Sequence, residues 1–304
     1  MTTESIPTNL RPRRTGLAGL VPQWNALSTV ALSFLVLLVL AATLADVVMP
    51  GAGAVTVADR QLPPLSTSDA TGVFHLLGTD SLGRDLVYQL LVGARVTLLV
   101  GLLSIVVAGT VGIALGLIAG YHPRGVGQVI MRVVDAQLTL PDVLIALLVL
   151  FVFGPSIVNL ILVVALCRWQ AYTRLTRALV LSMQDEAFVN AAKILGVRLW
   201  RILAVHILPN LRRPLLVLAT MEFARVMLIE SSLSFLGLGV QPPAVSWGLM
   251  LASGRNYIVS AWWLVTFPGI AILLTAVGFN YIAQTVGKDG RRTRRSPTSR
   301  KKAA

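Results

Sequence analysis

The sequence predicts an all-α integral membrane protein with about six transmembrane helices, and three observations support this fold class. The chain has 304 residues, of which 55% are hydrophobic and 13% charged, and its mean hydropathy is +0.77. This composition is too apolar for a soluble domain of that length. The apolar residues gather in runs of roughly 20, the length that a helix needs to cross a bilayer. A closed β-barrel would instead need alternating segments of ~10 residues, and none is recognisable.

Six apolar runs account for the predicted spans, and the segments between them are polar or rich in Pro and Gly. A signal peptide is the competing interpretation of the first run, which follows a basic start. That run is, however, longer than the usual apolar core of ~7–15 residues, so a first span is favoured. The spans are expected at 26–45, 96–119, 133–153, 157–172, 214–235 and 262–286.

The distribution of Lys and Arg predicts the orientation of the chain in the membrane. If odd-numbered spans run outward, about 20 of the 26 basic residues fall on the cytoplasmic side. Both termini are then cytoplasmic. The net charge of +13 follows from this placement and does not indicate nucleic-acid binding. The expected regions are a cytoplasmic segment 1–25, a first helix with an external loop 26–95, a core 96–286 with a cytoplasmic loop 173–213, and a basic tail 287–304 that also meets lipid.

A polar, basic stretch at 185–210 separates two of the predicted spans. Ala191 and Ala192 are small and favour a helix, Gly196 can adopt the left-handed conformation that ends one, and Pro209 is expected to mark a bend. A helix–turn–helix of this kind is suited to docking into a groove on a partner. An ordinary amphipathic connector fits these residues equally well.

The same stretch resembles the EAA loop of ABC-importer permeases. That pattern is Glu-Ala-Ala, three residues, Gly, nine residues, a hydrophobic residue, any residue, and Leu-Pro. Here an asparagine stands at the Glu position, and a histidine stands where Ile is usual, as is common in the peptide/nickel branch. Ala191, Ala192, Gly196, Leu208 and Pro209 fit the pattern. The positions that the resemblance assigns to coupling with an ATPase are Asn190, Ala191, Ala192, Gly196, His206, Leu208 and Pro209.

Further segments resemble the second permease subunit of dipeptide, oligopeptide and nickel importers. They lie at 75–85, 93–95, 116–121, 132–135 and 233–248. The resemblance implies a type I ABC importer permease fold in a bacterial inner membrane. It also implies a sister permease, two cytoplasmic ATP-binding subunits and an extracytoplasmic solute-binding protein as partners, with alternating access as the mechanism. The expected cargo is a peptide, with nickel or a metal chelate as the alternative.

Small residues recur every four positions in the second predicted span. Such a stripe lets two helices approach closely, so tight packing is expected within the bundle or against the sister permease. Flexible gating is the lesser interpretation. The stripe consists of Ala108, Gly112, Gly116 and Gly120.

Charged residues in or near the spans are costly and therefore informative. Glu222 and Arg225 are three apart on one helical face and are expected to neutralise each other, as are Arg132 and Asp135. Glu230 has no obvious partner on its own helix. Glu222, Arg225 and Glu230 either line the translocation path or form structural contacts in the bundle.

No enzyme chemistry is expected from this chain. Residues 78–85 approach the spacing of a phosphate loop but lack its lysine and hydroxyl residue, so ATP hydrolysis is assigned to a separate subunit. The three histidines have no metal-ligand spacing, and neither a metal nor a cofactor is expected. Cys167 is interpreted as a small packing residue.

Two other functional classes remain as alternatives. An ion-coupled secondary transporter would use buried carboxylates such as Glu222 and Glu230 as coupling sites. The helix–turn–helix stretch at 185–210 argues against that class. A membrane-anchored receptor or scaffold is the weaker third interpretation, because no signalling domain is evident.

Overall fold

The structure, a computed structural model, describes residues 26–292 of the chain. The predicted segment 1–25 and residues 293–304 of the basic tail lie outside that range. Helices dominate the described part, and a short antiparallel pair of strands, β1 (Ser66–Thr67) and β2 (Phe74–His75), lies between the first two helices. The helices are α1 (Ala26–Val48), α2 (Leu86–Tyr121), α3 (Val126–Leu138), α4 (Asp142–Phe153), α5 (Ile157–Met183), α6 (Ala187–Ile194), α7 (Leu199–Arg201), α8 (Leu208–Phe235), α9 (Trp247–Gly254) and α10 (Trp263–Arg292).

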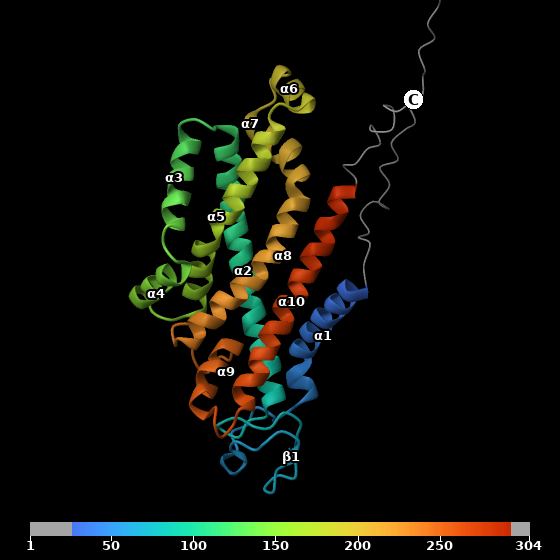
Figure 1. Cartoon of the computed structure of the whole chain (residues 1–304), viewed down its shortest axis with the longest axis vertical. Helices are drawn as coiled ribbons and strands as arrows, with labels where there is room; N and C mark the ends of the chain where they lie inside the picture. Colours follow the sequence, from blue (N-terminus) through green and yellow to red (C-terminus); the bar gives the residue numbers. More distant parts are fainter. Residues whose placement is uncertain (1–25, 293–304) are drawn as a thin grey trace, which may run out of the picture.

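The long helices form an elongated bundle whose two ends are built from different segments of the chain. Helix α2 packs along α5, α8 packs on α2 and α5, and α10 lies between α8 and α1. The short helices α6 and α7 form one end of the bundle, and the strand pair forms the opposite end (Figure 1). Helix α9 lies toward the strand end. Segments 185–210 and 46–85, which the charge distribution assigned to opposite sides of a membrane, therefore lie at opposite ends of the protein.

The α2–α5 contact depends on glycines in α2. A Cβ atom at Gly112 would overlap the carbonyl oxygen of Trp169, and one at Gly116 would lie 2.5 Å from Cβ of Thr176. The hydroxyl of Thr173 donates a hydrogen bond of 3.1 Å to the Gly112 carbonyl across the interface. Gly120 continues this line, since a Cβ there would lie 2.6 Å from Cβ of Val180. The structure thus places the small-residue stripe inside this chain, against α5.

Helix α2 begins at Leu86, ten residues before the predicted start of the second span. The Asp85 carboxylate caps this end by accepting hydrogen bonds from the backbone N–H groups of Val87 and Tyr88. The other Asp85 oxygen lies 2.7 Å from Nδ1 of buried His75 on β2. The loop of 46–85 is thereby tied to the helix that follows it. Hydropathy alone missed this start because the first turns of α2 are less apolar than its centre.

The segment predicted as a single span, 133–153, is not one continuous helix, because the chain forms two helices there. Helices α3 and α4 meet at 89° around residues 139–141. Pro141 has no N–H group to donate and disfavours helical geometry in the residue before it, so it ends α3 and begins α4.

The number of spans also differs from the prediction, although the all-α membrane fold is confirmed. Four helical segments among the described residues are long and apolar enough to cross a membrane, or five if the bent pair counts as one. The predicted fourth span at 157–172 lies in α5, which is longer but more polar. Several polar side chains lower its hydropathy, and those of Arg168, Gln170 and Thr173 are buried in the bundle. The qualifying segments are Ala26–Val48, Leu86–Tyr121, Leu199–Phe235 and Trp263–Gly287.

The predicted loop at 173–213 is largely helical. Helix α5 continues to Met183, and α7, a π-helix at Ile202–Ile207 and α8 form one continuous helical segment. The bend expected at Pro209 is absent from this segment. Pro209 is the second residue of α8 and directly follows the π-helix, and a local π-helical adjustment accommodates a proline within a continuous helix.

Substitution of Gly112 by alanine should test the α2–α5 contact. We expect Gly112→Ala to lower the free energy of unfolding by about 1–3 kcal/mol, because the new methyl group meets backbone that cannot move aside. Gly109→Ala is the matched control, since its Cβ would lie 3.6 Å from Tyr172, an ordinary contact. Thermal unfolding in detergent measures both. Equal melting temperatures for the two variants would contradict the packing role.

Candidate functional site

The helix at one end of the bundle, α6, ends in a tight turn. Gly196 has a φ of +70°, in the left-handed region that favours glycine. The N–H of Val197 donates to the carbonyl of Ala192 at 3.1 Å, the bond that ends a helix in a Schellman motif. The chain therefore reverses just after α6 and enters α7.

The expected coupling residues lie along this segment but face different ways. Ala192 is buried and packs inward, whereas Ala191 is exposed. The side-chain amide of Asn190 donates to the Asp185 carbonyl at 3.2 Å and so holds α6 to the preceding turn. His206 lies in the π-helix with Nδ1 3.3 Å from the Arg201 carbonyl oxygen. Leu208 and Pro209 begin α8.

The sequence interpretation missed the apolar side chains that this turn presents. Ile194 and Leu195 at the end of α6 are 86% and 81% exposed, and Trp200 in α7 is 57% exposed. Large apolar side chains clustered on a polar surface are typical of a contact with another molecule. We call Ile194, Leu195 and Trp200 the apolar tip. The sequence could have indicated this tip, because its three residues lie beside the EAA-like positions.

A cluster of four charges joins three helices in the bundle. The Glu222 carboxylate of α8 is 1% exposed, and its Oε2 lies 2.5 Å from Nη2 of Arg168 on α5. Arg168 Nη1 also contacts Oδ2 of Asp142, the first residue of α4, at 2.9 Å. Arg225 Nη1 contacts the other Glu222 oxygen at 3.2 Å. Two cations and two anions thus balance in this charge cluster.

The structure changes the pairing expected from sequence. Arg225 does contact Glu222, but the tighter partner is Arg168, 54 residues away in the sequence. Asp135 pairs with Arg174 of α5 at 2.5 Å and not with Arg132, so the second expected pair is wrong. The spacing of charges along a helix can identify ion-pair partners on that helix but not on a neighbouring one. The signal for the missed partner was Arg168 itself, a charge inside an apolar segment.

Glu230 is held by hydroxyl groups. It is fully buried, and its two oxygens accept hydrogen bonds from Ser234 at 2.8 Å and Ser231 at 3.3 Å. These serines lie on the same helix, so the sequence expectation that Glu230 had no local partner was wrong. Side-chain hydroxyls were overlooked as donors to a buried carboxylate.

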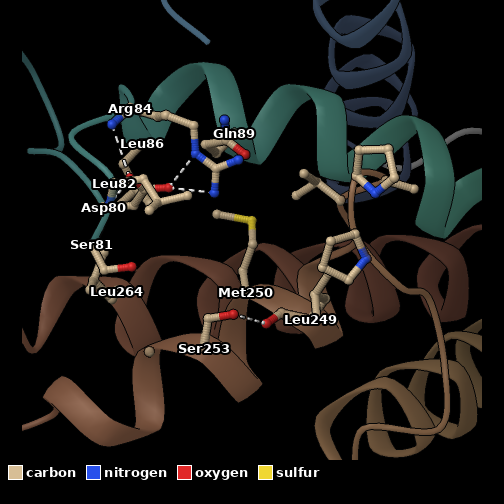
Figure 2. Close-up of a pocket in the computed structure, with 15 residues that line it drawn as sticks. Asp80, Ser81, Leu82, Arg84, Leu86, Gln89, Leu249, Met250, Ser253 and Leu264 are labelled. Atoms are coloured by element: carbon tan, nitrogen blue, oxygen red, sulfur yellow. Dashed lines mark hydrogen bonds and ion pairs between the residues drawn. The ribbon is translucent and has the colours of Figure 1, made fainter. Parts of the chain in front are cut away.

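At the strand end, a cavity of about 310 Å³ lies between the lead-in to α2, the segment 242–245 and α9. Asp80 and Arg84 lie on one side of it, and Leu249, Met250 and Ser253 of α9 lie on the other (Figure 2). This cavity, which we call the outer pocket, was missed from the sequence because its walls come from separate parts of the chain.

The segment 78–85, which approaches phosphate-loop spacing, folds as a turn around Asp80. Asp80 Oδ1 accepts hydrogen bonds from the N–H groups of Leu82 and Arg84, and Oδ2 accepts one of 2.7 Å from Arg84 Nε. The aspartate thus fixes both the backbone and the Arg84 guanidinium.

Residues 26–292 contain no group of three or more His, Cys, Asp or Glu side chains placed to hold a metal ion. His75 pairs with Asp85, and His206 lies near the opposite end of the bundle. Cys167 is buried in α5, where its Sγ donates to the Asp142 carbonyl at 3.4 Å.

Comparison with known proteins gives the family. The model of the binding-protein-dependent transport system inner membrane component family matches residues 112–289, more than half of the chain. The di/tripeptide transport system permease protein DppC of Pseudomonas aeruginosa is 43% identical over 249 residues, 82% of each protein. The chain belongs to the ABC importer permeases of the dipeptide family. The dipeptide transport system permease protein DppC of Escherichia coli K12 is 41% identical over 256 residues, 84% of this chain and 85% of the relative.

A third relative, the probable D,D-dipeptide transport system permease protein DdpC of Escherichia coli K12, is 39% identical over 227 residues, 75% of this chain and 74% of the relative. Permeases of this family are non-enzymatic, multi-pass inner-membrane subunits of ABC transport systems, which function with partner subunits. The expected non-enzymatic role is therefore confirmed. The nickel alternative is not supported by these relatives, which are named as dipeptide permeases. Membership of an ABC family also argues against a self-sufficient ion-coupled transporter.

Two substitutions in the charge cluster should distinguish the buried Arg168–Glu222 ion pair from the more exposed contact between Arg225 and Glu222. We expect Glu222→Gln to lower the free energy of unfolding by about 3–5 kcal/mol, because it leaves buried Arg168 with one anionic partner. Arg225→Gln should cost less than about 1 kcal/mol, because the Arg225 side chain is 66% exposed. Folded yield and melting temperature in detergent measure both. Normal stability of Glu222→Gln with altered transport would instead favour a direct role in the path.

Proposed function

We propose that this permease forms half of the translocation path of an ATP-driven importer of short peptides. Its partners are a similar permease, two cytoplasmic ATP-binding subunits and an extracytoplasmic solute-binding protein. The observation that carries the proposal is family membership, together with relatives named as dipeptide and di/tripeptide permeases over most of their length. The molecule supports it with an exposed apolar tip at one end and a pocket at the other.

The α6 end faces the cytoplasm in this proposal, and both termini lie on the same side. Basic residues gather around α6, α7 and the ends of α5 and α8, as expected for segments on the cytoplasmic side. They are Arg174, Arg177, Lys193, Arg198, Arg201, Arg212 and Arg213. The strand end and the outer pocket then face the solute-binding protein.

The apolar tip docks into a groove on an ATP-binding subunit. A short helix whose apolar side chains enter a groove is a common mode of protein recognition. Ile194 and Leu195 supply the contact, and the left-handed Gly196 sets the direction in which they project. Asn190 and Ala192 have supporting roles: one holds α6 to the preceding turn and the other packs it inward.

The helical segment from α7 through α8 connects this tip to the charge cluster. It continues from Leu199 to Phe235 and carries Glu222. Movement of the tip with the ATP-binding subunit therefore shifts α8 relative to α5. ATP and the partners drive the change because they bind the two conformations with different affinities.

The membrane charges divide into two roles. Glu222 and Glu230 are buried and satisfied by neighbouring groups, so we assign them to the structure of the bundle. Arg225 is the exposed member of the charge cluster, and we assign it to the wall of the path. The stripe of Gly112, Gly116 and Gly120 packs against α5, so contact with the sister permease is assigned to other faces.

Co-purification with transport reconstitution tests the proposal. The tagged permease, expressed with the neighbouring genes of its transport system, should retain an ATP-binding subunit. The assembled complex with its binding protein should take up a dipeptide into liposomes when ATP is supplied. Uptake by this chain alone under an ion gradient would contradict the proposal.

Leu195→Glu should uncouple ATP hydrolysis from uptake, because a charge replaces an 81% exposed apolar contact that a groove would bury. We expect peptide uptake to fall at least about tenfold with unchanged insertion and melting temperature. Val259→Glu is the control for retention of the ATP-binding subunit, because Val259 is 97% exposed but follows α9 near the opposite end. Loss of ATP-binding-subunit retention in the Leu195 variant alone supports the docking role. Normal coupled uptake by both variants would exclude the tip as the docking element.

A further inference from the structure

We infer that the outer pocket binds the C-terminal residue of a short peptide as the cargo enters the permease. This inference rests on the proposed function and adds a cargo site in the permease itself. The pocket offers three kinds of group together: an anchored cation, a buried hydrogen-bond acceptor and an apolar wall. A peptide C-terminus carries the matching groups close together, namely a carboxylate, an amide N–H and a side chain.

The cation is Arg84, held in place by Asp80. Nε and Nη2 of Arg84 both lie 2.7 Å from Asp80 Oδ2. A guanidinium has five N–H donors, so these contacts leave Nη1 and one Nη2 hydrogen for a ligand. Its side chain is 27% exposed. A guanidinium fixed by one carboxylate is well suited to binding a second one.

The acceptor is Gln89, on the first turns of α2. Its side chain lines the pocket and the residue is 4% exposed, yet its Oε1 has no hydrogen-bond partner among the described residues. A buried carbonyl oxygen without a donor is costly, so a ligand N–H that reaches it gains affinity. Gln89 and Arg84 lie on the same wall of the pocket in Figure 2.

The rest of the pocket is mainly apolar. Its apolar lining comes from Leu249 and Met250 of α9, Leu264 of α10, Leu86 of α2, and Pro242 and Pro243. The volume of about 310 Å³ is at the lower end of ligand pockets, which suits one or two residues of a peptide.

Other ligand classes fit this chemistry less well. Asp80 already accepts three hydrogen bonds and an ion-pair contact from Arg84 Nη2, two contacts at each oxygen, so it has no free position for a metal ion or an ammonium group. An inorganic anion would use Arg84 but would leave the apolar wall without a partner. A peptide C-terminus uses all three kinds of group.

Binding of chemically altered dipeptides tests the inference without changing the protein. The permease complex, in lipid nanodiscs and without its binding protein, is titrated with alanyl-leucine by equilibrium dialysis. Two analogues are compared with it: the C-terminal amide, which lacks the carboxylate, and the form methylated at the peptide nitrogen, which lacks the N–H. We expect each analogue to bind about tenfold more weakly, the effect of losing one good hydrogen bond or ion pair.

Gln89→Leu then identifies the acceptor. This variant should bind alanyl-leucine about tenfold more weakly, and methylation of the peptide nitrogen should cause no further loss. Gln170→Leu is the matched control, because buried Gln170 of α5 also has an unpartnered Oε1 among the described residues but lies outside the pocket. It should behave like the unaltered complex with all three peptides.

The outcomes separate this inference from the proposed function. Equal binding of the three peptides, or no binding, by the unaltered complex overturns the pocket assignment. So does a Gln89→Leu variant that still distinguishes the methylated peptide. Uptake of alanyl-leucine is measured separately with the binding protein present. Uptake without pocket binding leaves the proposed function standing and overturns only the inference, whereas absence of peptide uptake overturns both.

Discussion

The neutralisation of Arg168 inside the bundle is the interaction on which the rest of this structure depends. A guanidinium within the apolar part of a membrane costs at least about 2.5–3.5 kcal/mol unless carboxylates meet it. Glu222 and Asp142 meet it, and they come from α8 and α4. One buried charge on α5 therefore brings two other helices, α4 and α8, to the same place in the bundle. The break at Pro141 contributes to this arrangement, because it lets α4 begin with Asp142 beside Arg168.

The α2–α5 contact and the α5–α8 contact differ in how much movement they allow between the helices. The α2–α5 interface brings the backbones together at Gly112 and Gly116, where there is no space for a shift without collision. The α5–α8 contact, by contrast, includes ion pairs among four charges, and ion pairs can exchange partners over small movements. The glycine interface is thus suited to a rigid core and the charge cluster to a movable joint. Because α8 also continues into the α7 end, this joint lies on the segment that leads from the apolar tip.

The sequence predicted the helical membrane class and the positions of most spans, because both depend on local apolar composition. It also predicted the left-handed Gly196, since only glycine tolerates that conformation easily. What it could not supply were contacts between distant segments: Arg168 with Glu222, and Arg174 with Asp135. The expectation of one continuous span at 133–153 missed the break between α3 and α4, because an apolar run was weighed above Pro141, although the proline was visible in the sequence.

Some candidate site residues could likewise be predicted from local sequence, whereas others depend on contacts between distant segments. The EAA-like positions were found by pattern, but the pattern does not tell which side chains face outward, and the structure shows Ala192 buried and Leu195 exposed. A substitution at Ala192 would therefore disturb the packing of α6 before it affected any partner, whereas one at Leu195 tests docking directly. The outer pocket had no local pattern, since Arg84 and Met250 are brought together only when α9 packs on α2. The two ends of the molecule thus differ in how they are specified: a continuous motif builds the apolar tip, and tertiary packing builds the pocket.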